Sequence, residues 1–190
     1  MAILEPSLVY ALPLAGGKAV RWERETAAWL ANARQKGADA VYARLHGGAR
    51  EEVAVVEWLV KEAGMEVLAP GWMAGECAGK CGLHFRGDGG EGLVEAKGNA
   101  GAGQWMGQSC HSLEEVVAAE RRGADYIFIS PIFPTLTHPE ARPLGLEALA
   151  EVCEAVNIPV FALGGINETN APTVLKAGAS GIAAIRMFLG

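Results

Sequence analysis

The sequence lacks any excess of basic residues: 16 Lys and Arg stand against 22 Asp and Glu, for a net charge of −6. Nucleic acids and anionic membranes attract proteins through clustered Lys and Arg, so neither partner is expected. Long apolar runs are also missing, since none approaches the roughly 20 residues of a membrane-spanning helix. These absences predict a soluble, cytoplasmic protein. The net charge does not argue against a small anionic ligand, because a local pocket can be positive on an acidic protein.

Cysteine is scarce as well. Four cysteines in 190 residues are too few for a disulfide-built fold. Cys77 and Cys81 have C-x3-C spacing, which raises a zinc site as the alternative. No second Cys/His pair follows at the spacing of a zinc finger. We therefore expect unpaired thiols.

What the sequence does contain is an alternation of apolar strand-like runs and amphipathic helical segments. Hydrophobic residues make up 51% of the chain, enough for one full core, and we expect residues 1–190 to form a single domain. The strand-like runs lie at 8–13, 40–45, 65–69, 81–87, 104–109, 126–130, 159–165 and 181–186. The clearest helical segments lie at 21–37, 50–64, 112–123, 144–156 and 168–177.

Eight such units predict an α/β fold, the (β/α)8 TIM barrel, with a doubly wound open sheet as the alternative. Residues 64–103 hold 12 of the 25 glycines. Glycine costs about 1 kcal/mol in a helix interior. We therefore predict a compact barrel with shortened helices around residues 70–103. Ser112 and Glu115 have the S-x-x-E spacing of a capping box at the start of one helix.

Active sites of such barrels lie at the carboxyl ends of the strands. All four histidines fall at such ends, where we favour hydrogen bonds to an anionic substrate over a metal cluster and assign no metal ligands. For His84 and His111 a purely structural role, with the ring hydrogen-bonded to backbone, is an equal alternative. The polar residues at these ends are Arg44, His46, His84, Arg86, Asp88, Ser109, His111, Ser130, Thr135, Thr137, His138 and Arg186.

The segment "ALGGINETNA" follows a buried strand and precedes a helix. Gly164 and Gly165 let the backbone approach a ligand closely, and the helix would face the same spot with its amino end. With Arg186 arriving from the next strand, this pattern favours a phosphate site, although a plain Gly-Gly turn is the simpler alternative. The preceding loop, "SPIFPTLTHPEARPLGL", is stiffened by prolines that would present Thr135 and Thr137 rigidly.

The ordered series S-x-H-S, A-D-Y, P-x-F-P-T-x-T, L-G-L and I-P-V-x-A-x-G-G-I resembles the thiamine-phosphate synthase family, including its thiazole tautomerase branch (TenI). The resemblance is strong over 107–189 and weaker over 1–106. It implies a (β/α)8 barrel and a transferase of thiamine biosynthesis. Such an enzyme joins hydroxymethylpyrimidine pyrophosphate to thiazole phosphate and releases pyrophosphate, with cations and Mg²⁺ stabilising the leaving group.

The resemblance also assigns site residues. Arg44, Ser109, Thr135, Thr137, Gly164 and Gly165 stand where the family has the same residues. His46 and His138 replace family lysines, and Arg186 replaces a serine. The catalytic candidates are thus His138, Arg44, His46 and Ser109, and the substrate-binding and phosphate-binding candidates are Thr135, Thr137, Gly164, Gly165, Arg186 and His111.

The family's metal-binding Asn-Asp pair is replaced by Pro70-Gly71, which leaves Asp88 as the one candidate Mg²⁺ ligand. A single carboxylate binds Mg²⁺ weakly. Two alternatives to the synthase follow: a thiazole phosphate tautomerase or other Mg²⁺-independent isomerase, with His138, His111 or His46 as general acid or base, and a non-catalytic binder of phosphorylated ligands. The expected partners are small phosphorylated thiazole and pyrimidine molecules, and a homo-oligomer stays open.

Overall fold

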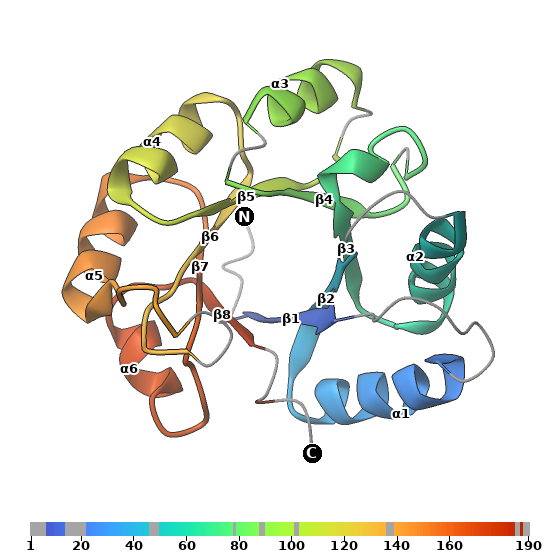
Figure 1. The fold of residues 1–190 in the computed structure, drawn as a ribbon, viewed down its shortest axis with the longest axis horizontal. Coiled ribbons are helices and arrows are strands. Elements are labelled where there is room, and N and C mark those ends of the chain that lie inside the picture. The colour runs from blue at the N-terminus through green and yellow to red at the C-terminus, as the bar shows by residue number, and fades with distance from the viewer. Residues whose placement is uncertain are drawn as a thin grey trace.

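A computed structural model describes residues 7–13, 22–45, 50–77, 79–87, 90–100, 103–135, 139–184 and 187. Eight parallel strands pair in sequence order, and the last closes on the first, as Figure 1 shows in a view along the barrel. The strands are β1 (Ser7–Pro13), β2 (Ala38–Arg44), β3 (Glu66–Pro70), β4 (Gly82–Phe85), β5 (Met106–Cys110), β6 (Tyr126–Ile129), β7 (Val160–Leu163) and β8 (Gly181–Ala184). The predicted (β/α)8 barrel is confirmed, and each strand overlaps a predicted strand-like run.

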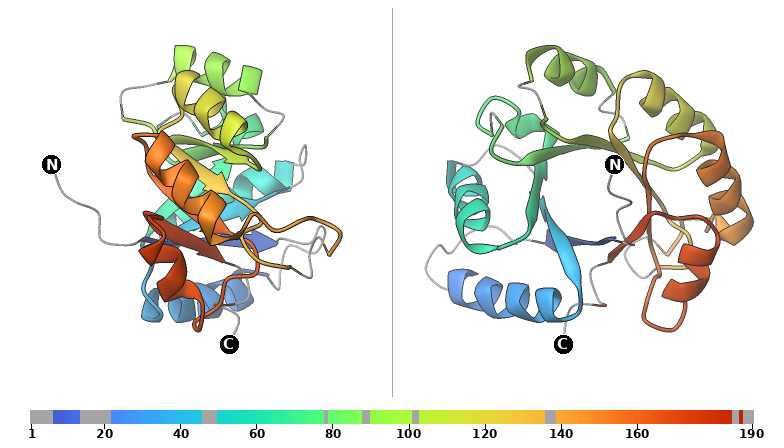
Figure 2. Two further views of the ribbon diagram at one scale, coloured as in Figure 1. Left: turned by 90° about the vertical axis from the view of Figure 1, so that its left-hand side faces the viewer. Right: turned by 180° about the vertical axis from the view of Figure 1, so that it is seen from behind.

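Helices ring the outside of the barrel, as the right-hand view of Figure 2 shows. They are α1 (Trp22–Gln35), α2 (Arg50–Glu62), the 3-10 helix η1 (Gly71–Met73), α3 (Gly90–Asn99), α4 (Leu113–Arg121), α5 (Gly145–Ala155) and α6 (Ala171–Lys176). Within the described part of the chain, no helix has the length and apolar character needed to cross a bilayer.

The glycine-rich region shortens the helical layer between β3 and β4, where the connection carries only the three-residue η1. The next helix is not unusually short, since α3 has ten residues whereas α4 has nine and α6 has six. Gly71 is required at the start of η1, because a Cβ there would lie 2.3 Å from Cδ1 of Phe85. Cys77 and Cys81 flank the next turn, and all four cysteines are free.

The core has two layers. Alternate side chains of the strands fill the barrel itself, among them Tyr42, Tyr126, Phe128 and Phe161. The opposite faces of the strands pack against the helices in a larger apolar layer. Side chains alternate along a strand, so every second residue points into the barrel. The next inward-pointing residue toward the carboxyl end of the strand, beyond the interior layer, therefore lies at the barrel mouth. In this way β2 presents Arg44 two residues after Tyr42.

Candidate functional site

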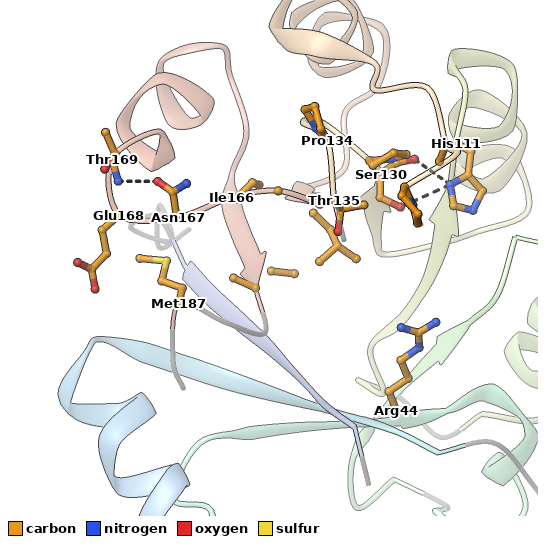
Figure 3. A pocket seen from close by; sticks show the side chains of 18 of the residues that line it. Arg44, His111, Ser130, Pro134, Thr135, Ile166, Asn167, Glu168, Thr169 and Met187 are labelled. Carbon is orange, nitrogen blue, oxygen red and sulfur yellow. Dashed lines mark hydrogen bonds between the residues drawn. The ribbon is translucent and has the colours of Figure 1, made fainter. Parts of the chain in front are cut away.

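A pocket of about 1070 Å³ opens at the barrel mouth. Figure 3 shows side chains from well-separated parts of the chain around it, with Arg44 extending from β2 toward the loop after β6. The polar lining residues are Lys36, Arg44, His111, Ser130, Thr135, Asn167, Glu168 and Thr169. The lining also includes three prolines, whose backbone is rigid, and two glycines, which carry no side chain: Pro131, Pro134, Pro139, Gly164 and Gly165.

The glycine pair after β7 forms one wall of this pocket. Gly164 and Gly165 have φ values of 97° and 66°, in the left-handed region that favours glycine. The loop after β6 packs directly on them: the amide of Ile132 donates to the Leu163 carbonyl at 3.0 Å, and that of Phe133 to the Gly164 carbonyl at 3.0 Å. The two loops therefore form one continuous surface, with Thr135 on it.

The amino end of α6 already has acceptors of its own. The Asn167 side-chain oxygen accepts from the amides of Thr169 at 2.9 Å and Asn170 at 3.2 Å. Asn170 in turn accepts from the Asn167 amide at 2.8 Å and donates to the Gly165 carbonyl at 3.0 Å. These bonds rigidify the loop beside Gly165. They also occupy the amides of Thr169 and Asn170 near the start of α6, where the sequence pattern predicted a phosphate site.

His111 is held on the other side of the pocket by two neighbours. Its Nδ1 lies 2.8 Å from the Ser130 carbonyl oxygen, which can only accept, so Nδ1 carries the proton. The neutral ring then has an unprotonated Nε2. The His111 amide donates to the Glu115 carboxylate at 2.7 Å. The predicted capping box is confirmed for Ser112, whose Oγ accepts from the Glu115 amide at 3.3 Å, but Glu115 reaches back to His111 instead of Ser112.

Below the mouth lies a buried polar chain that the sequence did not reveal. His84 is 1% exposed in the aromatic interior, with its ring centroid 4.2 Å from that of Phe128. Its Nδ1 lies 3.2 Å from the Tyr126 hydroxyl, and its Nε2 lies 2.7 Å from Ser109 Oγ. Tyr126 also donates to the Leu83 carbonyl at 3.1 Å. Burial lowers the pKa of His84 to about 3, so its ring is neutral at pH 7.

Positive charge gathers at the mouth of this acidic protein. Burial raises the pKa of the Tyr42 hydroxyl, and the charges of Arg44 and Arg86 oppose that rise. Both guanidinium groups are therefore close enough to act on the same interior group. Lys36 also reaches the pocket, where its Nζ donates to the Met187 carbonyl at 2.9 Å and pairs with Glu168 at 3.5 Å. The charged groups in the pocket lining are thus the cations of Lys36 and Arg44 and the carboxylate of Glu168.

The described residues do not fit a Mg²⁺ site at the end of β3. Pro70 is the last residue of β3 and Gly71 packs on Phe85, so neither supplies an oxygen-bearing side chain. No cluster of three His, Cys, Asp or Glu side chains suited to a metal occurs within the ranges that the structure describes. Asp88, the one predicted candidate, lies outside those ranges.

Five of the predicted residues line one pocket: Arg44, His111, Thr135, Gly164 and Gly165. Ser109 is not part of this lining and is instead hydrogen-bonded to the buried His84. The predicted His46, Thr137, His138 and Arg186 lie outside the described residues. Sequence reasoning missed Lys36 and Asn167. The only signal for Asn167 was an asparagine between a glycine pair and a helix, where side-chain capping is common.

Fold and pocket together define a (β/α)8 barrel with a pocket of polar and small residues at its mouth. Residues 15–188 match the family described as thiamine monophosphate synthase, and the chain belongs to this family. The confirmed resemblance thus extends into the amino-terminal half, where the motifs were weaker.

Solved and curated relatives agree with this assignment. Thiamine phosphate pyrophosphorylase from Pyrococcus furiosus superposes with a TM-score of 0.74 at 29% identity, over 95% of this chain and 85% of that one. A thiamine-phosphate synthase of Pyrococcus furiosus is 51% identical over 85 residues, 45% of this chain and 41% of its own length. One of Chloroflexus aurantiacus is 48% identical over 81 residues, 42% of this chain and 38% of its own. These matches span less than half the length of the curated relatives.

Proposed function

We propose that the protein is a transferase of the thiamine-phosphate synthase type, which joins hydroxymethylpyrimidine pyrophosphate to thiazole phosphate and releases pyrophosphate. The observation that carries this proposal is the pocket itself. Arg44 extends from β2 toward the loop that carries Thr135 (Figure 3), and Gly164 and Gly165 line the same pocket in a barrel of this family. A cation facing bare backbone and a hydroxyl is an arrangement suited to phosphate.

The proposed reaction needs charge stabilisation more than proton transfer. The bond between the pyrimidine's methylene carbon and the pyrophosphate oxygen breaks, and both electrons leave with pyrophosphate. The thiazole nitrogen then gives its lone pair to the methylene carbon and forms the new C–N bond. Negative charge develops on the leaving group, where a preorganised guanidinium such as that of Arg44 stabilises it. The hydroxyl of Thr135 is proposed to donate a hydrogen bond to a phosphate oxygen.

Family members are expected to use Mg²⁺ for the leaving group. Because the described residues do not fit that ion, we assign no step of this proposal to a metal. Arg86 is proposed to supply positive charge on the side of β4, since its guanidinium acts on the same Tyr42 as Arg44 does. Catalysis at the cytoplasmic location expected from the sequence, and assembly into a homo-oligomer, stay predictions.

The proposal is tested by measuring thiamine phosphate formation from the two substrates, with Mg²⁺ and with a chelator. We expect product in the presence of Mg²⁺, and the chelator measures how much of the rate depends on that ion. No product at high enzyme concentration in the presence of Mg²⁺ would contradict the synthase activity. In that case, conversion of thiazole phosphate alone, followed by NMR, would indicate the isomerase alternative, and binding without conversion would indicate a binding protein.

A further inference from the structure

Two thiols meet beneath the connection from β3 to β4. Cys77 follows η1, and Cys81 directly precedes β4. A turn folds the chain back between them, in which the Lys80 amide donates to the Cys77 carbonyl at 2.7 Å and Gly79 has a φ of 76°. The two side chains are hydrogen-bonded to each other. The thiol pair is therefore a product of the C-x3-C spacing and of this turn.

Backbone hydrogen bonds hold both cysteines in place. The Cys77 amide donates to the Met73 carbonyl at 2.9 Å, and Nε2 of Gln104 donates to the Cys81 carbonyl at 2.8 Å. Both cysteines are buried, with exposed fractions of 4% and 5%, whereas Lys80 on the turn is exposed. The thiols thus lie just below the surface, where a small reagent reaches them with little opening of the turn and a large one is shielded from them.

The two thiols are not equivalent. The hydrogen bond that the Cys81 thiol donates lowers the pKa of the Cys77 thiol, and burial opposes this change. The same bond, followed by burial, raises the pKa of Cys81. The charge of Lys80 also favours the Cys77 thiolate, whereas the carboxylates of Glu76 and Glu57 oppose it. Because the thiolate is the reactive form of cysteine, Cys77 is the nucleophile of the pair.

The other two cysteines lie in different parts of the helical layer. Cys110 Sγ donates to the Gln108 carbonyl at 4.0 Å, and Cys153 of α5 packs near Gly178. Burial raises the pKa of Cys110 to about 12 and that of Cys153 to about 11. Cys153 is nevertheless more exposed than Cys77. These two thiols serve as internal references, since exposure and thiolate character predict opposite orders of reactivity for Cys153 and Cys77.

We propose that Cys77 and Cys81 form a redox-active dithiol pair, which hydrogen peroxide converts to a disulfide. The Cys77 thiolate attacks one peroxide oxygen, the O–O bond breaks, hydroxide leaves, and Cys77 becomes a sulfenic acid. The sulfur of Cys81 then attacks the sulfur of Cys77, so that the S–S bond forms, the S–O bond breaks and water leaves. In total the two thiols lose two electrons and two protons, and one peroxide is reduced to two molecules of water.

The disulfide would fasten a part of the barrel that has little helical cover, since the connection from β3 to β4 carries only the three-residue η1. Cys81 precedes the first residue of β4, so the pair lies away from the carboxyl ends of the strands that form the mouth. The inference is therefore independent of the proposed reaction, and the assay for thiamine phosphate does not bear on it. A dithiol reductant restores both thiols by exchange and leaves as its own disulfide.

The wild type tests the pair directly. The reduced full chain is treated with hydrogen peroxide, denatured and alkylated, and its cysteine peptides are mapped by mass spectrometry. We expect two of the four thiols to be lost, a link between Cys77 and Cys81 with a mass decrease of about 2 Da, and recovery of both thiols with dithiothreitol. Oxidation of Cys153 before Cys77, or conversion of Cys77 to a sulfinic acid without a link, would overturn the proposal. A link that forms in urea but not in the folded protein would overturn it as well.

Variants assign the two roles. Cys81→Ser keeps an O–H donor beside Cys77 but removes the second thiol, so the Cys77 sulfenic acid should persist and be trapped by dimedone. In Cys77→Ser, trapping at Cys81 should be at least about 10-fold slower. Cys153→Ser is the matched control and should form the link at the wild-type rate within about 2-fold. Equal trapping in the first two variants contradicts the role given to Cys77. If either variant fails to fold, as thermal melting would show, the peptide map of the wild type still decides whether the disulfide forms.

Discussion

Gly165 and Pro134 lie so close together that a Cβ on Gly165 would stand 2.5 Å from the Pro134 carbonyl oxygen. Gly164 meets the same loop, with a Cβ position 2.7 Å from Cα of Pro131. A glycine pair that sequence reasoning assigned to phosphate therefore has a second role, which is to let the proline loop after β6 dock on β7. The pocket wall exists because both residues lack side chains.

Gly165→Ala should lower the free energy of unfolding by about 2 to 4 kcal/mol, through left-handed backbone strain and overlap with the loop. Gly79→Ala is the matched control, because Gly79 also has a positive φ, of 76°, but nothing lies within 4 Å of its Cβ position. Gly79→Ala should show only the backbone part, about 1 kcal/mol. Urea unfolding followed by circular dichroism measures both. Equal losses in the two variants would show that contact with Pro134 costs nothing.

The barrel was predictable because its signal is local and repeated. Each strand is a short apolar run, and Gly37, Gly64 and Gly123 end helical segments with the positive φ that only glycine adopts readily. Arg44 and Thr135 could be placed at the mouth by the rule for strand ends. The bonds of His84 with Ser109 and Tyr126 could not be predicted, since they join residues 25 and 42 positions apart in the sequence.

Gly71→Asp is not expected to restore a metal ligand after β3. A Cβ at this position overlaps the Phe85 ring, so the aspartate has to displace a buried side chain. We expect a loss of about 1 to 3 kcal/mol in unfolding free energy and no gain in Mg²⁺ affinity. Gly75→Asp, where nothing lies within 4 Å, should stay within about 0.5 kcal/mol of the wild type. Tighter Mg²⁺ binding by the Gly71 variant in a calorimetric titration would contradict this account.

His84 predicts how stability depends on pH. Its folded pKa is about 3 and its unfolded pKa about 6.5, so the unfolded chain binds more protons between these values. The stability contributed by neutral His84 is present above about pH 6.5 and is lost as the pH falls toward 3. From pH 7.5 to pH 5 the loss attributable to His84 is about 2 kcal/mol.

Urea unfolding of the wild type and of His84→Phe at these two pH values measures that contribution. Other titrating groups affect both proteins equally, so the difference between their pH dependences isolates His84. The variant should lose about 2 kcal/mol less than the wild type over this interval. Identical pH dependences would mean that His84 is protonated as readily in the fold as in the unfolded chain.

Glu115 links the cap of α4 to His111, because its carboxylate accepts the His111 amide at 2.7 Å. Glu115→Gln keeps an acceptor and the length of the side chain, whereas Glu115→Ala leaves the amide to water. We expect the alanine variant to lose about 1 kcal/mol of stability and to bind pyrophosphate more weakly, since the position of His111 is no longer fixed. The glutamine variant should recover most of both quantities. Calorimetric titration measures the pyrophosphate affinity, and urea unfolding measures the stability. An alanine variant that equals the wild type in both would show that Glu115 has no role in the site.

Arg44 carries the strongest test of the anion site, because it is the arginine that lines the described pocket. Arg44→Ala should weaken pyrophosphate binding about 10- to 100-fold, the loss of one or two charge-assisted hydrogen bonds. Arg121→Ala removes the same charge from the exposed last turn of α4 and should change affinity less than about 2-fold. Arg44→Lys should recover part of the loss, because an ammonium keeps the charge but not the planar fork of donors. Equal effects of Arg44→Ala and Arg121→Ala in the same titration would show that net charge, and not the mouth of the barrel, holds the anion.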